Sequence, residues 1–269
     1  MSVEIYREVL NLVERGEAGA LCTVVYARGS TPRHEGSKML VYADGHFIGT
    51  VGGGELENRV HKEALAAIQD GRPRLLRYDM VDPQRGDPGV CGGQLEVYVE
   101  PVLPKPMIVV IGGGHVGKAV THLAKWLGFR VAVCDDRPEF CTPEFNPDAD
   151  EFYPVPMSEL PKHLRIHSQT YLILTTRGSV VDIEGLPALL ETPAAYIGVI
   201  GSKRRWAVTR KALIERGIAE SSLARVVSPI GLEINAETPE EIAVSIMAEI
   251  IMLRNGGSGR RMKETVSGG

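Results

Sequence analysis

Residues 108–117 read Ile-Val-Val-Ile-Gly-Gly-Gly-His-Val-Gly, and this stretch decides the fold of the second half of the chain. Its four apolar residues predict a buried strand, and the pattern G-x-G-x-x-G follows at the start of a predicted helix. In such a pattern Gly112 forms the turn, Gly114 lets the backbone approach a pyrophosphate, and Gly117 permits close packing of helix on strand. The free N–H groups at the helix start favour an anion, and His115 is a candidate to hydrogen-bond a phosphate there.

An acidic residue stands at the end of the second predicted strand of this unit. Asp135 lies 23 residues after Gly112, where an acid commonly accepts hydrogen bonds from ribose hydroxyls. Asp136 and Arg137 follow it. A 2′-phosphate would suit Arg137, but the neighbouring carboxylate argues against that choice of ligand. The sequence therefore predicts a Rossmann-type β-α-β unit over residues 107–136, with the alternative that its glycines serve packing alone.

The same glycines come close to a second phosphate-binding pattern, the Walker A loop. Residues 112–119 read G-x-x-x-x-G-K-A, whereas the Walker A loop ends in a Ser or Thr whose hydroxyl holds Mg²⁺. Ala119 has no hydroxyl, so the sequence excludes an ATPase of this class.

Predicted strands and helices alternate through the rest of the second half. Short apolar strands that alternate with helices indicate a parallel sheet covered on both faces, which makes this half a Rossmann-like α/β domain. The expected strands are 107–111, 130–134, 171–175, 196–200 and 225–227, and the expected helices are 116–127, 183–190, 203–216 and 239–253.

The first half has a different organisation, a mixed α/β domain with short strands. Three prolines between residues 101 and 106 mark a linker. We therefore expect an N-terminal domain over 1–103, a Rossmann-like domain over 107–254 and a mobile, glycine-rich tail over 255–269. In the first half the expected helices are 3–13 and 55–69, and the expected strands are 20–27, 39–42, 47–50, 75–78 and 95–100.

Composition and charge narrow the classes of function. The chain of 269 residues has a net charge of −4, so it has no broad basic field and nucleic acid is not an expected partner. No apolar stretch reaches the roughly 20 residues that span a bilayer, and the beginning lacks a signal-peptide pattern. We expect a cytoplasmic protein without membrane contact, whose four cysteines are reduced and fit no zinc pattern.

Three segments of the first half carry more glycine and charge than a structural role requires. A triple glycine before a predicted helix can form an anion-binding nest, and Arg33 adds positive charge. Cys91 lies between glycines in a loop, where a thiol can be approached closely. The three segments are residues 29–38, 49–57 and 90–93.

These segments, in this order, strongly resemble the XdhC/CoxI family of molybdoenzyme accessory proteins. The resemblance continues through the glycine fingerprint and the sequence Asp-Asp-Arg at 135–137. It extends to Gly-Val-Ile-Gly-Ser-Lys-Arg-Arg at 198–205 and Ser-Pro-Ile-Gly-Leu at 228–232. It covers essentially residues 20–253, and the joint occurrence of the motifs is specific.

The resemblance implies a function that the residues alone do not. Family members resemble chaperones that bind molybdenum cofactor, a molybdopterin, protect it, and deliver it to xanthine dehydrogenase or a related molybdenum hydroxylase. A cysteine desulfurase sulfurates the cofactor, and the chaperones are often homodimers. The resemblance favours a maturation chaperone over an enzyme, and no catalytic triad, paired carboxylates or H-E-x-x-H motif stands out.

The resemblance also suggests roles for individual residues. For Cys91 it implies a soft thiolate contact to molybdenum or its sulfido ligand, while the alternative is a small residue in a glycine-flanked turn. Arg33 becomes a candidate for the pterin phosphate, and Glu55 or Glu57 for pterin N–H groups, although acids at a helix start also favour the helix dipole. Residues 203–205 (Lys-Arg-Arg) begin a helix, where positive charge is unfavourable without an anion. The candidate cofactor-binding residues are Ser30, Thr31, Arg33, Gly52, Gly53, Gly54, Glu55, Cys91, Gly92, Gly112, Gly114, His115, Gly117, Asp135, Asp136, Arg137, Ser202, Lys203 and Arg204.

Two other functions remain open at this point. The fingerprint and Asp135 favour an NAD(P)-dependent oxidoreductase, or binding of another nucleotide, although the sequence shows no catalytic pairing of Lys, Tyr or His. A third interpretation is a regulatory sensor whose Rossmann domain no longer binds a ligand.

Overall fold

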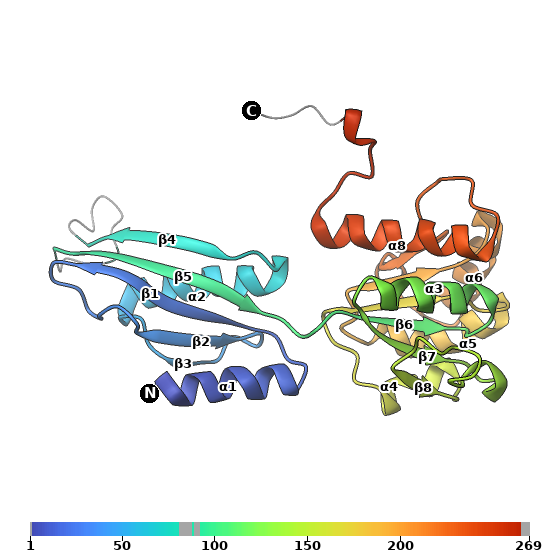
Figure 1. Cartoon of the computed structure of the whole chain (residues 1–269), viewed down its shortest axis with the longest axis horizontal. Helices are drawn as coiled ribbons and strands as arrows, with labels where there is room; N and C mark the ends of the chain where they lie inside the picture. Colours follow the sequence, from blue (N-terminus) through green and yellow to red (C-terminus); the bar gives the residue numbers. More distant parts are fainter. Residues whose placement is uncertain (1, 81–87, 89–91, 265–269) are drawn as a thin grey trace. The chain divides into compact units, whose positions relative to one another are not determined.

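The computed structural model describes residues 2–80, 88 and 92–264, and the chain divides into two compact units between Lys105 and Pro106. One unit is built around an antiparallel sheet and the other around a parallel sheet (Figure 1). The predicted fold class, a mixed α/β domain followed by a Rossmann-like domain, is confirmed. Among the described helices, none is both long and apolar enough to cross a membrane.

The unit formed by residues 1–105 is a five-stranded antiparallel sheet with two helices. Its strands lie in the order β3-β2-β1-β5-β4, so that β1 and β5 are central. Its elements are α1 (Ser2–Glu14), β1 (Gly19–Arg28), β2 (Lys38–Tyr42), β3 (Phe47–Gly49), α2 (Gly54–Asp70), β4 (Arg74–Asp79) and β5 (Gln94–Val102).

Strand β1 contributes to two hydrophobic cores. Ala20 and Val24 pack in one core with Leu56 of α2, whereas Leu21 packs in the other with Leu12 of α1. Because successive side chains of a strand point to opposite faces, α1 and α2 must lie on opposite faces of the sheet.

The unit formed by residues 106–269 has a six-stranded parallel sheet in the order β8-β7-β6-β9-β10-β11. The chain builds outward from β6 through β7 to β8, then returns to β9 beside β6. This reversal between β6 and β9 is a topological switch point, where open α/β sheets bind ligands at the carboxyl ends of their strands. The strands are β6 (Met107–Ile111), β7 (Arg130–Cys134), β8 (Glu151–Tyr153), β9 (Thr170–Leu174), β10 (Tyr196–Val199) and β11 (Val226–Val227).

Helices cover both faces of the parallel sheet. Val110 packs with Ile246 of α8 on the face that α3 and α8 share, and Val109 packs with Leu186 of α5 on the other. The neighbouring positions of α3 and α8 are visible in Figure 1. The helices are α3 (His115–Trp126), α4 (Leu160–His163), α5 (Ser179–Leu190), α6 (Lys203–Glu215), α7 (Glu220–Leu223) and α8 (Pro239–Asn255), with 3-10 turns η2 (Pro138–Phe140), η3 (Met157–Glu159) and η4 (Met262–Glu264).

The structure corrects several predicted element boundaries. Helix α5 begins at Ser179 rather than at 183, although β-branched Val180 and Val181 lower helix propensity in its first turn. Tertiary packing prevails there: a Cβ atom at Gly185 would lie 2.4 Å from Met157 of η3, so the two elements are in close contact. Strand β8, α4 and α7 are too short to give a periodic signal and were not predicted.

The end of the chain also differs from its prediction. Helix α8 continues to Asn255, where Gly256 ends it in a left-handed conformation with φ of 68°. Residues 262–264 form η4, which the predicted tail did not include. The predicted mobility of this segment stays a prediction.

Candidate functional site

Three glycines of the 112–117 loop are required by packing. Gly112 has a φ of +105°, which favours glycine, and a Cβ atom there would lie 2.6 Å from the Thr175 carbonyl oxygen. A Cβ atom at Gly113 would lie 2.3 Å from the Phe140 carbonyl oxygen, and one at Gly117 would lie 2.1 Å from the Gly112 carbonyl oxygen. The backbone of this loop is therefore in direct contact with its neighbours.

Gly114 differs from these three. It is the N-cap of α3 with a φ of −64°, and a Cβ atom there would meet no atom within 4 Å. Neither backbone conformation nor packing within the described residues calls for glycine at this position. The open space lies at the start of α3, whose first N–H groups have no partner within the helix. A ligand can approach the backbone there, as the second glycine of the fingerprint permits.

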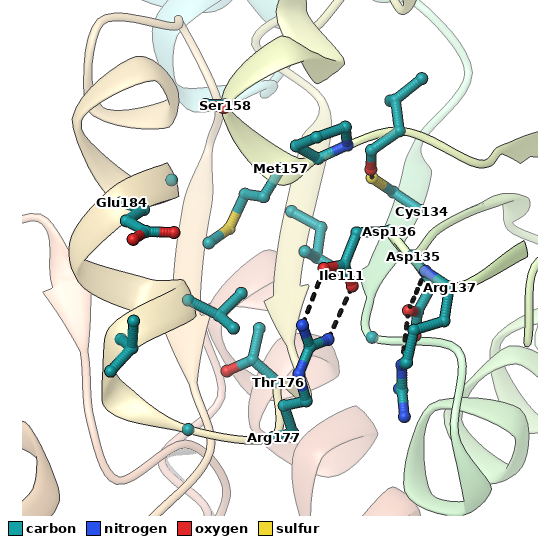
Figure 2. A pocket seen from close by; sticks show the side chains of 17 residues that line it. Ile111, Cys134, Asp135, Asp136, Arg137, Met157, Ser158, Thr176, Arg177 and Glu184 are labelled. Carbon is teal, nitrogen blue, oxygen red and sulfur yellow. Dashed lines mark hydrogen bonds and ion pairs between the residues drawn. The ribbon is translucent and has the colours of Figure 1, made fainter.

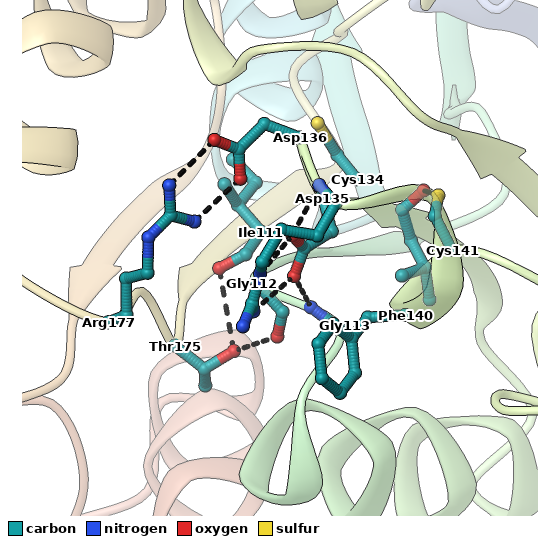
Figure 3. Close-up of polar contacts among 12 residues, drawn as sticks. Ile111, Gly112, Gly113, Cys134, Asp135, Asp136, Phe140, Cys141, Thr175 and Arg177 are labelled. Atoms are coloured by element: carbon teal, nitrogen blue, oxygen red, sulfur yellow. Dashed lines mark hydrogen bonds and ion pairs between the residues drawn. The ribbon is translucent and has the colours of Figure 1, made fainter.

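The Asp135 carboxylate is buried at the end of β7 and accepts four hydrogen bonds (Figure 3). Two come from backbone N–H groups: Gly113 donates to Oδ2 at 2.8 Å and Arg137 donates to Oδ1 at 2.9 Å. The Arg137 guanidinium donates from Nε to Oδ1 at 3.0 Å and from Nη2 to Oδ2 at 2.9 Å. Asp135 therefore ties the glycine loop to the segment that follows β7.

A cavity of about 310 Å³ lies at the carboxyl ends of β6, β7 and β9 (Figure 2). This is the switch point of the sheet, and the volume lies at the small end of the range for ligand sites. The cavity wall is completed by η3 and by the first turns of α5. Residues that carry its chemistry are Gly112, Cys134, Asp136, Arg137, Thr176 and Arg177.

A bidentate ion pair spans this cavity. Arg177 donates to Asp136 from Nη1 at 2.6 Å and from Nη2 at 2.7 Å, as Figure 2 shows. The two residues follow β9 and β7, so the pair connects loops on either side of β6. Hydrogen bonds from Arg177 lower the pKa of Asp136 to about 2, so its carboxylate is ionised at neutral pH.

A second charge pair supports the side of the cavity formed by α5. The Asp182 side chain is fully buried, and Arg205 Nη2 lies 2.6 Å from its Oδ2. Arg205 also donates to the Thr176 hydroxyl at 2.7 Å, and that hydroxyl donates to Asp182. A buried charge needs such a partner. The anion that pairs with Arg205 near the start of α6 is therefore Asp182 of the protein itself.

The cavity also contains a thiol. Cys134 Sγ donates to the Val155 carbonyl oxygen at 3.4 Å. Burial raises the pKa of this thiol to about 12, so it is neutral at physiological pH and a weak nucleophile.

In the N-terminal unit, the described residues of the three glycine-containing segments lie beside one another. A Cβ atom at Gly93 would lie 2.3 Å from the Ser30 carbonyl oxygen, and one at Gly52 would lie 2.9 Å from the Pro32 side chain. The Gly92 N–H donates to the Met80 carbonyl oxygen at 2.6 Å, which extends the pairing of β4 with β5 toward these loops. The described parts of all three segments therefore lie at one end of the antiparallel sheet.

Two positions in these loops are open. Gly53 and Gly54 have φ values of 79° and 61°, and a Cβ atom at either would meet no atom within 4 Å. They begin α2, where backbone N–H groups are free to bind an anion. Arg33 is exposed and follows Pro32, whose side chain lies against Gly52, and the Arg33 carbonyl oxygen accepts from the Thr31 hydroxyl at 3.0 Å.

The two acids at the start of α2 have different surroundings. Glu57 Oε2 accepts from the Thr50 hydroxyl at 2.6 Å and so stabilises the turn before the helix. Glu55 is exposed and accepts from Arg59 Nε at 2.9 Å, which lowers its pKa. The sequence did not reveal the role of Glu57.

The cavity brings together only part of the predicted set. Gly112, Asp135, Asp136 and Arg137 line it. His115 instead lines a hollow of about 500 Å³ between α3 and α8. Gly114 and Gly117 follow Gly112 at the start of α3 but do not line the cavity.

The other predicted residues lie elsewhere or outside the described residues. Ser202 caps α6 by accepting from Arg205 N at 3.2 Å, and Lys203 and Arg204 are exposed. Cys91, the predicted contact to molybdenum, lies outside the residues that the structure describes. Within the described ranges, no three His, Cys, Asp or Glu side chains form a group that could hold a metal ion.

The cavity residues that sequence reasoning missed include Cys134, Thr176 and Arg177. Their positions after buried parallel strands were the available signal, because the carboxyl ends of such strands meet at one edge. The role of Asp182 was also missed. Its place within an apolar segment could have indicated a buried charge.

Comparison with known proteins identifies the family. Residues 108–250 match the family model of the XdhC Rossmann domain, and residues 12–79 match that of the XdhC and CoxI family. The chain belongs to the XdhC/CoxI family. The first match includes β6 through most of α8, and therefore the strands whose ends form the cavity.

Relatives of this XdhC/CoxI protein carry related names. It is 31% identical over 321 residues to a Bacillus subtilis protein named as a probable component of xanthine dehydrogenase, covering 90% of this chain and 95% of that protein. It is 23% identical over 284 residues to the molybdenum cofactor insertion chaperone PaoD of Escherichia coli, covering 93% and 88%. Identity to the uncharacterized E. coli protein YqeB is 37% over 264 residues, yet the chain spans only 48% of YqeB.

A solved structure supports the fold. A crystal structure described as a xanthine dehydrogenase from Bacillus halodurans matches 96% of this chain and 97% of its own, with a TM-score of 0.50 and 25% identity. Two of these relatives are thus named after xanthine dehydrogenase and after molybdenum cofactor insertion.

Proposed function

We propose that this protein binds molybdenum cofactor, protects it and delivers it to xanthine dehydrogenase or a related molybdenum hydroxylase. The observation that carries the proposal is the open backbone position at Gly114, two residues after Gly112, which lines the cavity at the switch point of the sheet. It occurs in a family in which PaoD is named a molybdenum cofactor insertion chaperone.

The residues of the Rossmann-like unit suit the phosphate of the pterin. Free N–H groups at the start of α3 can donate to phosphate oxygens, and Gly114 leaves room for them to approach. His115 begins the same helix and can add a hydrogen bond. When bound, the cofactor would supply the molybdenum and its sulfur ligands, while the protein holds the phosphate and shields the group from water.

We propose that the loops of the N-terminal unit form a second candidate binding site for the cofactor. Gly53 and Gly54 leave the start of α2 open, and Arg33 and Glu55 add one charge of each sign. Cys91 is the proposed thiolate donor toward molybdenum or its sulfido ligand, because soft thiolates suit soft metal centres. The sulfido sulfur would come from a cysteine desulfurase, and two copies of the chain would form the working unit.

The test measures pterin bound to the protein after expression in cells that make molybdenum cofactor. Oxidised pterin fluorescence should accompany the wild-type protein through purification. Gly114→Ala should retain at least about tenfold less, because the added methyl group occupies the space through which the phosphate approaches. Gly257→Ala is the matched control: its Cβ atom would have ordinary contacts at 3.6 Å in a segment far along the chain.

Two results would reject the proposal. The first is a wild-type protein that carries no pterin and binds none on titration. The second is equal pterin content in wild type and Gly114→Ala, which would exclude this part of the fold as the site. For the thiol, Cys91→Ser should reduce retention of sulfurated cofactor, and unchanged transfer to the hydroxylase would exclude that role.

A further inference from the structure

The hydrogen bonds of Asp135 bear on which nucleotides the Rossmann-like unit can accept. An ionised carboxylate has about four lone-pair sites for hydrogen bonds. In Asp135, the backbone N–H groups of Gly113 and Arg137 use two of these lone-pair sites. The Arg137 side chain uses the other two sites. Asp135 as a whole is only 4% exposed, so little of its surface is accessible to solvent or to a ligand.

The guanidinium of Arg137 stands where a ribose diol would bind. An acid at the end of the second Rossmann strand recognises the two neighbouring hydroxyls of ribose. Nε and Nη2 of arginine likewise present two parallel donors to the two oxygens of a carboxylate. At 3.0 and 2.9 Å, these donors occupy the two sites that a diol would otherwise use.

The Arg137 side chain is held in this position from a second direction. Its guanidinium carbon lies 4.1 Å from the centre of the Phe140 ring in η2, a cation–π contact. The side chain is 35% exposed, whereas Asp135 beneath it is 2% exposed. A ligand must therefore break a bidentate pair and a ring contact before its ribose reaches the carboxylate.

We infer that Arg137 blocks the ribose-diol subsite and makes the Rossmann-like unit reject NAD(H) and other nucleotides that bind through a free diol. Nor does the site favour a 2′-phosphate. The Arg137 guanidinium is already paired with Asp135, and the neighbouring carboxylate of Asp136 would repel a phosphate. Arg137 is thus a specificity-determining residue that leaves the backbone site at Gly114 open. The inference concerns nucleotide selectivity and does not depend on the proposed binding of molybdenum cofactor.

The experiment is a calorimetric titration of the full chain with NAD⁺ and ADP-ribose. Wild type should show no saturable binding at millimolar concentrations. Arg137→Ala frees two acceptor sites on Asp135 and should gain affinity by a factor of about 10 to 100, the effect of one or two charge-assisted hydrogen bonds. The gain should disappear with 2′-deoxy-NAD⁺ and in the double variant Asp135→Asn/Arg137→Ala.

A second variant keeps the test decisive if Arg137→Ala fails to fold. Arg137→Gln retains side-chain bulk and one donor group, and it should gain less affinity than Arg137→Ala. Micromolar binding of NAD⁺ by wild type would overturn the inference, as would a folded Arg137→Ala or Arg137→Gln with no gain over wild type. The nucleotide titration is independent of the measurement of bound pterin. Either result can therefore reject its own proposal without rejecting the other.

Discussion

The ion pair between Asp136 and Arg177 joins the two loops that flank β6 at the cavity. Both side chains are partly exposed, 36% for Asp136 and 48% for Arg177, so solvent screens their attraction. Its structural effect is to hold two loops in one arrangement. Its contribution to stability is limited to about 0–1 kcal/mol by that screening.

This pair gives a pH-dependent prediction. The pKa of Asp136 is about 2 in the folded state and lies below the ordinary value, so the stabilisation is fully present above about pH 4. It is lost as pH falls through the folded-state pKa near 2. Arg177→Gln should return the pKa of Asp136 toward its ordinary value, as measured by NMR titration of its carboxyl carbon.

The free energy of unfolding provides the second readout for this pair. Wild type should exceed Arg177→Gln at pH 6, and the two values should converge toward pH 2. A pKa for Asp136 that stays low in Arg177→Gln would show that some other group depresses it.

Sequence reasoning reached some of these residues and not others. Asp135 follows from its spacing to Gly112, because that spacing is set by one helix and one strand. The use of the carboxylate by Arg137 could not be predicted, because it depends on side-chain rotamers in η2 and the preceding turn. Arg205 and Asp182 are 23 positions apart on different helices, so their contact needs the tertiary fold.

At the scale of elements, the loop between β6 and α3 shows two separate uses of glycine. Gly117 permits backbone contact with Gly112, whereas Gly114 leaves open space with an ordinary φ. The two positions can therefore be tested as a pair.

Gly117→Ala and Gly114→Ala should affect stability differently. A Cβ atom at Gly117 would lie 2.1 Å from a backbone oxygen, so overpacking should cost about 1–3 kcal/mol or more of unfolding free energy. Gly114→Ala should cost less, about 0.5–1 kcal/mol, because it changes only the N-cap of α3, where alanine is less favoured than glycine. Urea denaturation measures both, and a Gly117→Ala protein as stable as wild type would contradict the packing role.

Long periodic elements were predictable and short ones were not. Strand β6 is entirely apolar and α3 has a clear amphipathic pattern, so the prediction for both agrees closely with the structure. The first turn of α5 reads like a strand, and packing against η3 decides it. The three residues of β8 carry too little pattern to separate strand from loop.

At the scale of the whole chain, each unit has hydrophobic clusters of its own. Two clusters lie within residues 106–269 and two within 1–105, and each of these four contains residues of one unit alone. A domain with its own core can in principle fold by itself.

Separate expression tests this independence. A fragment over residues 106–264 should unfold cooperatively with heat and show the near-ultraviolet circular dichroism of packed aromatic residues. The fragment 2–105 is smaller and should be less stable, because a short chain buries a smaller fraction of its surface. A larger fragment without cooperative unfolding would show that its cores depend on the other unit.

The sequence identified the three N-terminal glycine segments but not their convergence. That convergence depends on the antiparallel pairing of β1 with β5, which places Arg28 opposite Gln94. Pairing between strands so distant along the chain leaves no local pattern. In the second unit the fingerprint located the switch point, because the fold around such a pattern recurs widely.

Transfer of the cofactor to a hydroxylase tests the proposed function most directly. Pterin-loaded protein is incubated with xanthine dehydrogenase purified from cells that lack the cofactor. Both the enzyme activity and the amount of pterin transferred are measured over time. Wild type should activate the enzyme faster than the same amount of free cofactor, and Gly114→Ala should not. Activation no faster than with free cofactor, or equal activation by wild type and Gly114→Ala, would contradict a role in delivery through this site.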